Sequence, residues 1–510
     1  MSVSDPCLIR SRDVRPCRCA FRQQRLQTSR GARRPAAGAG PGVIMHLSLS
    51  RRHDGVDRIS PLDLSNLRVE EQGMPMHIAA LAFLDGRPLL DEVGDLQLER
   101  IRRHVEERIR DIERLHQVLA WPKSRHRAPV WEDDRDFTVA DHVRTRRLPP
   151  PGDEDTLLRV CSELNAPALD RSRPLWELWL LNGLADGRVA FLLRLHHVVA
   201  DGAAALELFS SMLDPAPGTP APAPVSDNIA GRSPTIPSLS ASDQTQHGHS
   251  YAAQLKWVAT GGAMRVRRGW AVARLGMAPA LSWNQPVGSR RVHRFVRADL
   301  ARAKAVAHEY GGKVNDVVLA AVAGGAHALL ESRGELAPDL DMHVSVAASI
   351  RRPGETGGNR VGVRLVPAPV SDPDTANRLR TIAAHTATQR RWPPLQPNGR
   401  FQQRWVVHVM AHQRLINLVL SNMPGPPAPL SFAGASVQEM FQITLLQGNC
   451  AVGVGVLSYA GQLNVDIAAD PDVVPDAEVF TNGVAEAFEQ LGVAQTTSTP
   501  RMADDTSDAS

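Results

Sequence analysis

Two adjacent histidines, followed by an aspartate and a glycine, form the group of residues best suited to chemistry. The run His196-His197-Val198-Val199-Ala200-Asp201-Gly202 follows Val189–Leu195, whose apolar character predicts a buried strand. Neighbouring side chains of a strand point to opposite faces, so the two imidazoles cannot easily share a metal ion. One ring could instead face a cleft as a general base, because an imidazole titrates near neutral pH.

The same residues also have a purely structural interpretation. His196 and His197 could be imidazoles satisfied by hydrogen bonds inside the fold. Asp201 could be only the N-cap of a helix over Ala203–Leu213, with Gly202 easing the turn. The motif alone does not decide between the two interpretations.

The elements that would position this motif are a mixture of strands and helices. In the first structured segment, from about Ile59 to Asp214, strands are expected at Met76–Leu84 and Val189–Val199, and an amphipathic helix at Leu98–Leu119. In the second, from about Arg291 to Leu491, we expect helices at Leu300–Tyr310 and from Asn315-Asp316 onward. Further strands are expected at Met342–Ser349, Val361–Val366, Gln438–Leu446, Ala451–Tyr459 and Gln462–Ala468.

The length of 510 residues exceeds what one hydrophobic core usually organises. We therefore predict an α/β (mixed α+β) chain with two core-forming subdomains, at 56–214 and 291–491. Residues 215–290 would join them, beginning with a stretch rich in Pro, Ala and Ser. A tail at 492–510 is expected to be disordered.

The positive charge of the chain is concentrated in residues 1–44. That arm holds nine arginines and two aspartates, a net charge of +7, whereas the whole chain carries +4. The remaining residues therefore sum to about −3, which removes the main support for nucleic-acid binding. We interpret 1–44 as a disordered basic arm or as upstream sequence translated from an early start, with Met45 the functional beginning.

Cysteine usage fits a reducing cytoplasm. Of the five cysteines, Cys7, Cys17 and Cys19 lie in the arm, while Cys161 and Cys450 are far apart in the body, which is not a disulfide framework.

No apolar stretch reaches the length of a membrane-spanning helix. The segment Tyr251–Trp283 interleaves tryptophans with arginines and is either a surface helix packed on its domain or a helix that lies on a lipid surface.

Several further motifs give the histidine run a family context. Together they resemble the bacterial wax ester synthase/diacylglycerol acyltransferase family, within the superfamily of chloramphenicol acetyltransferase and peptide-synthetase condensation domains. The resemblance covers roughly Ile59 to Leu491 and is carried by Ser60-Pro61-Leu62-Asp63, Pro75-Met76-His77, Leu169-Asp170-Arg171-Ser172-Arg173, Pro174-Leu175-Trp176-Glu177, Asn315-Asp316-Val317-Val318-Leu319-Ala320, Gly358-Asn359-Arg360 and Ser421-Asn422-Met423-Pro424-Gly425-Pro426.

This resemblance implies two chloramphenicol-acetyltransferase-like subdomains with an active-site tunnel between them. His197 would be the general base, His196 its supporting neighbour, and Asp201 would point away toward an arginine, for which Arg351 is the candidate. The substrate-binding candidates are Gly202, Asn315, Ser421 and Asn422. Asn315 could also be only a helix N-cap, and Ser421 and Asn422 could only satisfy backbone groups beside the rigid turn Pro424-Gly425-Pro426.

The implied activity is O-acyl transfer from acyl-CoA to diacylglycerol, giving triacylglycerol, and to long-chain alcohols, giving wax esters. Acyl-CoA is a co-substrate, and no cofactor, metal or acyl-enzyme is needed. The implied location is the cytoplasm, with peripheral association at membranes or lipid inclusions. Two alternatives stay open: acyl transfer to a polyketide or peptide acceptor, and a lipid-surface binding protein that has kept the fold without turnover.

Overall fold

The computed structural model describes residues 59, 61–71, 75–122, 129–216, 276–349, 361–390 and 413–495. These residues belong to one compact unit spanning 47–510. The predicted arm at 1–44, most of the predicted linker with its tryptophan-bearing segment, the candidate Arg351 and most of the tail lie outside the described residues.

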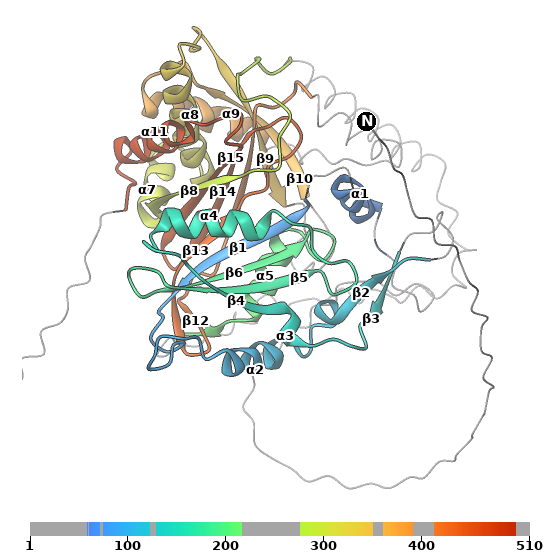
Figure 1. Ribbon diagram of the computed structural model, residues 1–510. Coiled ribbons are helices and arrows are strands. Elements are labelled where there is room, and N and C mark those ends of the chain that lie inside the picture. The colour runs from blue at the N-terminus through green and yellow to red at the C-terminus, as the bar shows by residue number, and fades with distance from the viewer. Residues whose placement is uncertain are drawn as a thin grey trace, which may run out of the picture. The chain divides into compact units, whose positions relative to one another are not determined.

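Two large mixed sheets form the framework (Figure 1). The first has seven strands in the order β4 (Val143–Arg147), β5 (Trp176–Asn182), β6 (Val189–His196), β1 (His77–Leu84), β13 (Ala435–Ile443), β12 (Leu430–Phe432) and β7 (Asp214–Pro215). The second has six, in the order β10 (Val361–Pro369), β9 (Asp341–Ser349), β11 (Leu418–Pro424), β14 (Val452–Tyr459), β15 (Gln462–Ala469) and β8 (Val292–Asp299).

Strands β12 and β13 link the two halves of the chain. They come from the second half of the sequence, yet β13 pairs antiparallel with β1 in the first sheet, with Leu81 opposite Phe441. The predicted division into 56–214 and 291–491 did not include this crossover. Local alternation predicted the strand but not its partner, because pairing between strands far apart in sequence leaves no local pattern.

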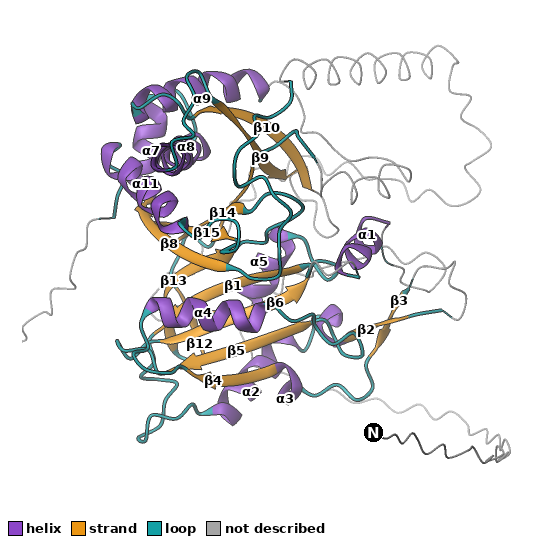
Figure 2. Ribbon diagram, turned by 45° about the horizontal axis from the view of Figure 1, so that its top comes forward, coloured by secondary structure: helices purple, strands orange, loops and turns teal. Residues whose placement is uncertain are grey.

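Helices cover both sheets (Figure 2). Around the first sheet lie α1 (Pro61–Glu70), α2 (Leu98–Ile109), the 3₁₀ helix η1 (Glu113–His116), α3 (Val139–His142), α4 (Glu154–Asn165) and α5 (Gly202–Ser211), together with the small hairpin of β2 (Gln117–Ala120) and β3 (Val130–Asp133). The second sheet is accompanied by α7 (Leu300–Glu309), α8 (Val314–Ser332), α9 (Thr375–Gln389) and α11 (Ala477–Gln490).

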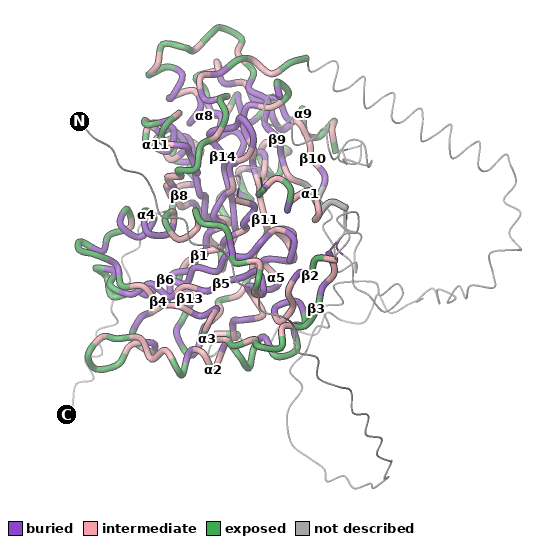
Figure 3. The backbone as a smooth tube through the Cα atoms, turned by 45° about the vertical axis from the view of Figure 1, so that its right-hand side comes forward, coloured by how far each residue is buried: buried purple, intermediate pink, exposed green. Residues whose placement is uncertain are grey.

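Three apolar clusters hold these layers together (Figure 3). One packs α8 and α11 against the second sheet; the others include residues of α2 and α5, and of α4, with the first sheet. The helix pair α8 and α11 is closely packed: a Cβ on Gly325 would lie 2.5 Å from the Phe480 carbonyl oxygen. Glycine is therefore needed there, because backbone cannot move aside as a flexible side chain can.

Helix α8 is long and apolar enough, by length and composition, to cross a membrane. However, 72% of that apolar window is buried inside the fold. This burial is typical of the core helix of a globular domain. Its apolar residues pack against the second sheet and α11.

Most predicted elements are present, with two informative differences. The expected helix at Leu98–Leu119 ends at Ile109, and its apolar residues Leu115 and Leu119 lie in η1 and β2 instead. Leu119 pairs with Trp131 across the β2–β3 hairpin, a contact that helical spacing does not reveal. Ser421 and Asn422, which could have served only to satisfy backbone groups beside the turn Pro424-Gly425-Pro426, lie on β11 in the middle of the second sheet.

Candidate active site

The histidine motif lies where β6 ends beside β1. His196 is the last residue of β6 and pairs with His77 on β1. The chain then turns, with the His197 N–H donating to the Met76 carbonyl at 2.8 Å and the Val199 N–H donating to the His196 carbonyl at 2.9 Å. The backbone of the motif is therefore held by the neighbouring strand rather than by a free loop.

His196 points into the protein. Its side chain is 1% exposed, and its Nδ1 accepts a hydrogen bond from the Val198 N–H at 3.0 Å. Because Nδ1 is an acceptor, the neutral ring carries its proton on Nε2, 3.5 Å from Glu70 Oε2. Burial lowers the pKa of His196, although the Glu70 carboxylate acts in the opposite direction. His196 thus fixes the turn that presents His197.

A buried carboxylate supports this pair of strands from behind. Glu70 ends α1, and its oxygens lie 3.3 Å from His77 Nε2 and 2.7 Å from an Arg171 nitrogen. Burial alone would raise the pKa of Glu70, but the interactions with His196, His77 and Arg171 outweigh it and hold that pKa well below its usual range. Glu70 is therefore an ionised group beneath the motif.

Sequence reasoning missed the role of Glu70. His77 and Arg171 were noted only for the family resemblance, and Glu70 was not singled out. An acidic residue seven positions before His77 was the available signal. Sequence spacing does not show that α1 brings this residue beneath β1 and β6.

His197 differs from its neighbour in environment. It is partly exposed, but its Nδ1 is enclosed and makes no hydrogen bond of good geometry with a described residue. Burial lowers the pKa of His197, while its own backbone carbonyl and the Asp201 carboxylate act to raise it. Nδ1 is the enclosed nitrogen of the ring. Nε2, on the other side of the ring, is the nitrogen that remains as the candidate proton acceptor.

Asp201 and Gly202 begin helix α5. Asp201 is 1% exposed. Its carboxylate accepts a hydrogen bond from the Ala204 N–H at 3.0 Å, which is an N-cap interaction. The structural interpretation of Asp201 therefore applies, whatever further role it has. A Cβ on Gly202 would lie 2.8 Å from Met423 Sδ, so the end of the motif packs closely against β11.

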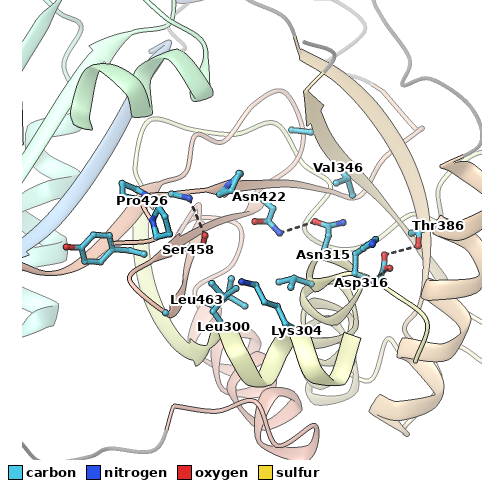
Figure 4. Close-up of a pocket in the computed structure, with 18 of the residues that line it drawn as sticks. Leu300, Lys304, Asn315, Asp316, Val346, Thr386, Asn422, Pro426, Ser458 and Leu463 are labelled. Carbon is cyan, nitrogen blue, oxygen red and sulfur yellow. Dashed lines mark hydrogen bonds between the residues drawn. The ribbon is translucent and has the colours of Figure 1, made fainter. Parts of the chain in front are cut away.

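The second half brings two of the predicted substrate-binding residues together. Asn422 Nδ2 on β11 donates to Asn315 Oδ1 in the first turn of α8 at 3.3 Å (Figure 4). Asn315 is not the N-cap, a position that Lys313 occupies. Ser421 alternates with Asn422 along β11, so its side chain lies on the other face of the strand.

These two asparagines line a cavity of about 840 Å³ beside the second sheet. Asn422 and Pro424 face this cavity, whereas Met423 between them lines a much smaller one with Gly202 and Leu206 of α5. One face of β11 therefore lines the cavity, and the other face packs against the end of the histidine motif. The cavity is further lined by Leu300, Lys304, Lys313, Val314, Asp316, Val346, Arg364, Thr386, Arg390, Pro426, Ser458, Tyr459 and Leu463, among others.

No sequence motif predicted the cationic residues of this cavity. Asp316 is buried and accepts a hydrogen bond from the Thr386 hydroxyl at 2.8 Å, and Arg390 pairs with it at 3.2 Å. Burial and the neighbouring Arg390 charge lower the pKa of Arg364.

Over the described ranges, no group of three or more His, Cys, Asp and Glu side chains is arranged to hold a metal ion.

Comparison with protein families matches nearly the whole described region. The model for the wax ester synthase/diacylglycerol acyltransferase catalytic domain matches residues 59–318, and the model for the C-terminal domain of that family matches residues 357–492. The second match contains β11, β12 and β13. The two matches together therefore include the histidine motif, all strands of the first sheet, and all strands of the second sheet except β9.

Curated relatives are similar over most of their length. A putative diacylglycerol O-acyltransferase of Mycobacterium tuberculosis (strain CDC 1551 / Oshkosh) is 30% identical over 464 residues, which covers 86% of this chain and 90% of the relative. A probable diacylglycerol O-acyltransferase, tgs1, of Mycobacterium tuberculosis (strain ATCC 25618 / H37Rv) is 29% identical and covers 86% of this chain and 96% of the relative.

Solved structures share the fold at lower identity. The wax ester synthase/diacylglycerol acyltransferase from Marinobacter aquaeolei VT8 matches with a TM-score of 0.61 and 23% identity, covering 85% of this chain and 100% of that one. The first condensation domain of the calcium-dependent antibiotic synthetase matches with a TM-score of 0.56 and 16% identity, covering 86% and 97%. These matches confirm the predicted fold class.

Proposed function

Since the chain belongs to the wax ester synthase/diacylglycerol acyltransferase family and is an O-acyltransferase, we propose that it transfers a fatty acyl group from acyl-CoA to the hydroxyl of diacylglycerol. His197 is the proposed general base. The observation that carries this assignment is the contrast between the two histidines, because His196 is enclosed and held by Val198 and Glu70 whereas His197 is partly exposed.

In the proposed reaction, His197 is the only protein group that accepts and returns a proton. The acceptor oxygen attacks the thioester carbonyl carbon while its proton passes to His197 Nε2. The tetrahedral intermediate then expels the CoA sulfur as the C–S bond breaks, and the proton on His197 is returned to the leaving thiolate. The products are an ester and free CoA, and such base assistance contributes typically about 10² to 10⁴ in rate.

A lowered pKa suits this role. A base must be unprotonated before it acts, and burial lowers the pKa of His197, which keeps the ring neutral at physiological pH. His196 and Glu70 are positioning residues in this scheme: they fix the turn after β6 and do not touch the substrate. Asp201 holds the start of α5 in place.

The acceptor assignment follows the relatives, two of which are named as putative or probable diacylglycerol O-acyltransferases. A long-chain alcohol, giving a wax ester, is a second acceptor of the same chemistry, as in the name of the Marinobacter protein. Transfer to a polyketide or peptide acceptor is the main alternative. Only the proposed reactions give a neutral glyceride or a wax as product.

The test compares wild type with His197→Ala, using labelled acyl-CoA with diacylglycerol and hexadecanol side by side and thin-layer separation of the products. His308→Ala, an exposed histidine on α7, is the matched control. We expect loss of turnover only in His197→Ala. Retention of full activity in that variant would exclude His197 as the base, and absence of turnover in wild type would favour a binding protein without catalysis.

We further propose that the protein works in the cytoplasm at a lipid surface. Diacylglycerol and long-chain alcohols partition into bilayers and lipid inclusions, so the enzyme has to meet them there. Two exposed apolar side chains support this: Met277 is 70% and Leu415 43% exposed, and the Ala278 N–H donates to the Arg414 carbonyl between them. Flotation with liposomes tests it: Met277→Ser combined with Leu415→Ser should reduce binding, and unchanged flotation would argue against this surface.

A further inference from the structure

The much smaller cavity on the other face of β11 carries one polar side chain. Its volume is about 20 Å³, and apolar residues line it from β1, β6, α5, β11 and β14. Gln442 of β13 is the only polar side chain among the described residues that line it. This amide therefore stands alone in apolar surroundings.

The side-chain amide of Gln442 makes no hydrogen bond with any residue that the structure describes. Its Oε1 atom is fully enclosed and has no partner. Leaving a buried amide unpaired costs free energy, and buried polar groups of native proteins are almost always paired. An apolar side chain of equal size would stabilise the fold more, so the presence of the amide points to a ligand.

Water is a poor partner for this amide. A cavity of about 20 Å³ has room for roughly one or two water molecules. A water molecule inside a protein needs about two to four polar partners, whereas the side chains of this cavity supply one. A ligand that is mostly apolar and carries a single hydrogen-bonding atom fits such a lining better.

The cavity adjoins the turn that carries His197. Gly202, the last residue of the histidine motif, lines it. In the first sheet, Gln442 lies opposite Ala80 on β1, and Ala80 lies opposite Leu193 on β6. Two strand spacings of about 4.8 Å therefore separate Gln442 from the strand that ends at the motif, a gap of about 10 Å.

The side of the cavity formed by α5 and β11 can open. Gly202 and Leu206 of α5 and Met423 of β11 are only half-buried. Methionine is unbranched and has three rotatable bonds, so the Met423 side chain can turn away and enlarge the cavity. A ligand then enters between α5 and β11 with its alkyl part against the apolar lining.

A diacylglycerol carries the group that this amide lacks. An ester carbonyl accepts hydrogen bonds and donates none, so it pairs with the NH₂ group of a glutamine, which rotation of the amide can turn toward the cavity. The free hydroxyl of a diacylglycerol and its nearest ester lie on neighbouring carbons of glycerol. With the hydroxyl at His197, that ester fits in the gap of about 10 Å on the side of Gln442.

We propose that Gln442 donates a hydrogen bond to an ester carbonyl of the diacylglycerol acceptor and so favours glycerides over long-chain alcohols. Gln442 is a specificity-determining residue in this scheme and moves no proton. The inference rests on the proposed function for its choice of acceptor. A long-chain alcohol, which has no ester, occupies the same apolar lining without this contact.

The first experiment compares dioctanoylglycerol with its diether analogue, dioctylglycerol, which keeps the free hydroxyl and both chains but has no carbonyl group. Initial rates with acyl-CoA give kcat/KM for each glyceride, and for hexadecanol, on wild type, Gln442→Met and Gln438→Met. Methionine keeps the length of the glutamine side chain and removes its donor. Gln438 is exposed on the same strand and is the matched control.

Wild type should use the diester about fivefold better than the diether, which is the effect of one neutral hydrogen bond. In Gln442→Met this preference should vanish through a loss on the diester alone, with the constants for the diether and hexadecanol as in wild type. Gln438→Met should keep the preference. The Tm of Gln442→Met should equal or exceed that of wild type, because methionine replaces an unpaired amide.

Two results would overturn the proposal. An absence of any preference for the diester in wild type would show that no ester carbonyl meets a donor. Equal losses on all three acceptors in Gln442→Met would place the amide at the thioester of the donor instead, or in folding alone if the Tm falls as well.

A second experiment separates this inference from the proposed function. Isothermal titration calorimetry with the two glycerides, without acyl-CoA, measures binding on wild type and Gln442→Met. If wild type binds the diester more tightly than the diether through Gln442 yet transfers no acyl group, the binding assignment stands and the proposed activity fails. If wild type acylates both glycerides equally, the activity stands and the assignment of Gln442 fails.

Discussion

Glu70 Oε2 lies 3.5 Å from His196 Nε2, beneath the end of the strand that presents His197. The same carboxylate also contacts His77 and Arg171. One ionised group therefore connects helix α1, both central strands of the first sheet and the segment that precedes β5. Such a group affects both stability and the geometry of the turn that carries His197.

Replacing Glu70 by Gln should lower both stability and kcat. At neutral pH we expect a loss of about 2 kcal/mol in the free energy of unfolding, because Arg171 would lose its buried partner. The pKa of Glu70 is depressed in the folded state, so its stabilising contribution is present above its unfolded pKa and lost as pH falls through the folded value. The difference between the two proteins should accordingly shrink in acid.

Chemical denaturation at several pH values and steady-state kinetics measure these effects. Glu71→Gln is the matched control, because Glu71 is exposed and touches Arg171 only at 3.4 Å. A wild-type kcat with normal stability in Glu70→Gln would show that this carboxylate does not position the motif.

The acid limb of the pH–rate profile should reflect His197. Burial lowers the pKa of this imidazole below its ordinary 6.5, so the neutral, active form persists to a lower pH than in a free histidine. We expect kcat/KM to fall on acidification with a midpoint below 6.5. A midpoint above 6.5 in wild type would contradict the assignment, and His308→Ala should leave the midpoint unchanged.

Gly202→Ala tests the packing between the motif and β11. An added Cβ would meet Met423 Sδ at 2.8 Å, and a methionine side chain can move aside at a cost of about 1 kcal/mol or more. We expect a small fall in Tm and a several-fold fall in kcat, since the shift occurs at the start of α5. Adding Met423→Ala should restore much of kcat by opening that space; no restoration would mean that Gly202 acts through its backbone instead.

The sequence predicted the strand end that carries the proposed base more fully than the surroundings of that strand end. The histidine motif stands in one short run, so type and spacing allow a base at a strand end, and the family resemblance assigns that role to His197. Asn315 and Asn422 were also singled out, and the structure places them 3.3 Å apart across α8 and β11. Their proximity depends on a contact between residues 107 positions apart, which no local pattern contains.

The features missed are those that arise from long-range packing. Lys304, Lys313, Arg364 and Arg390 resemble ordinary solvated charges in the sequence and gather only when α7, α8, α9 and β10 surround one cavity. Glu70 likewise becomes a buried partner of His196 only after α1 packs behind β6. The crossover of β12 and β13 was missed for the same reason, because strand alternation predicts an element and not its neighbour.

Asn315 and Asn422 can be tested as a pair by a double-mutant cycle. Each Asn→Ala change removes their shared hydrogen bond and one of the amide groups that face the cavity. We expect each single variant to raise the KM for acyl-CoA several-fold with little change in kcat, because an amide that binds a substrate does not move its protons.

The double variant should lose less than the product of the two single effects, with a coupling free energy of about 1 kcal/mol, since the shared hydrogen bond can be lost only once. Asn377→Ala, at an exposed position on α9, is the control and should behave as wild type. Strictly multiplicative effects would mean that the two amides act independently. A fall in kcat at constant KM would instead place Asn315 and Asn422 in contact with the reacting atoms rather than with a distant part of the substrate.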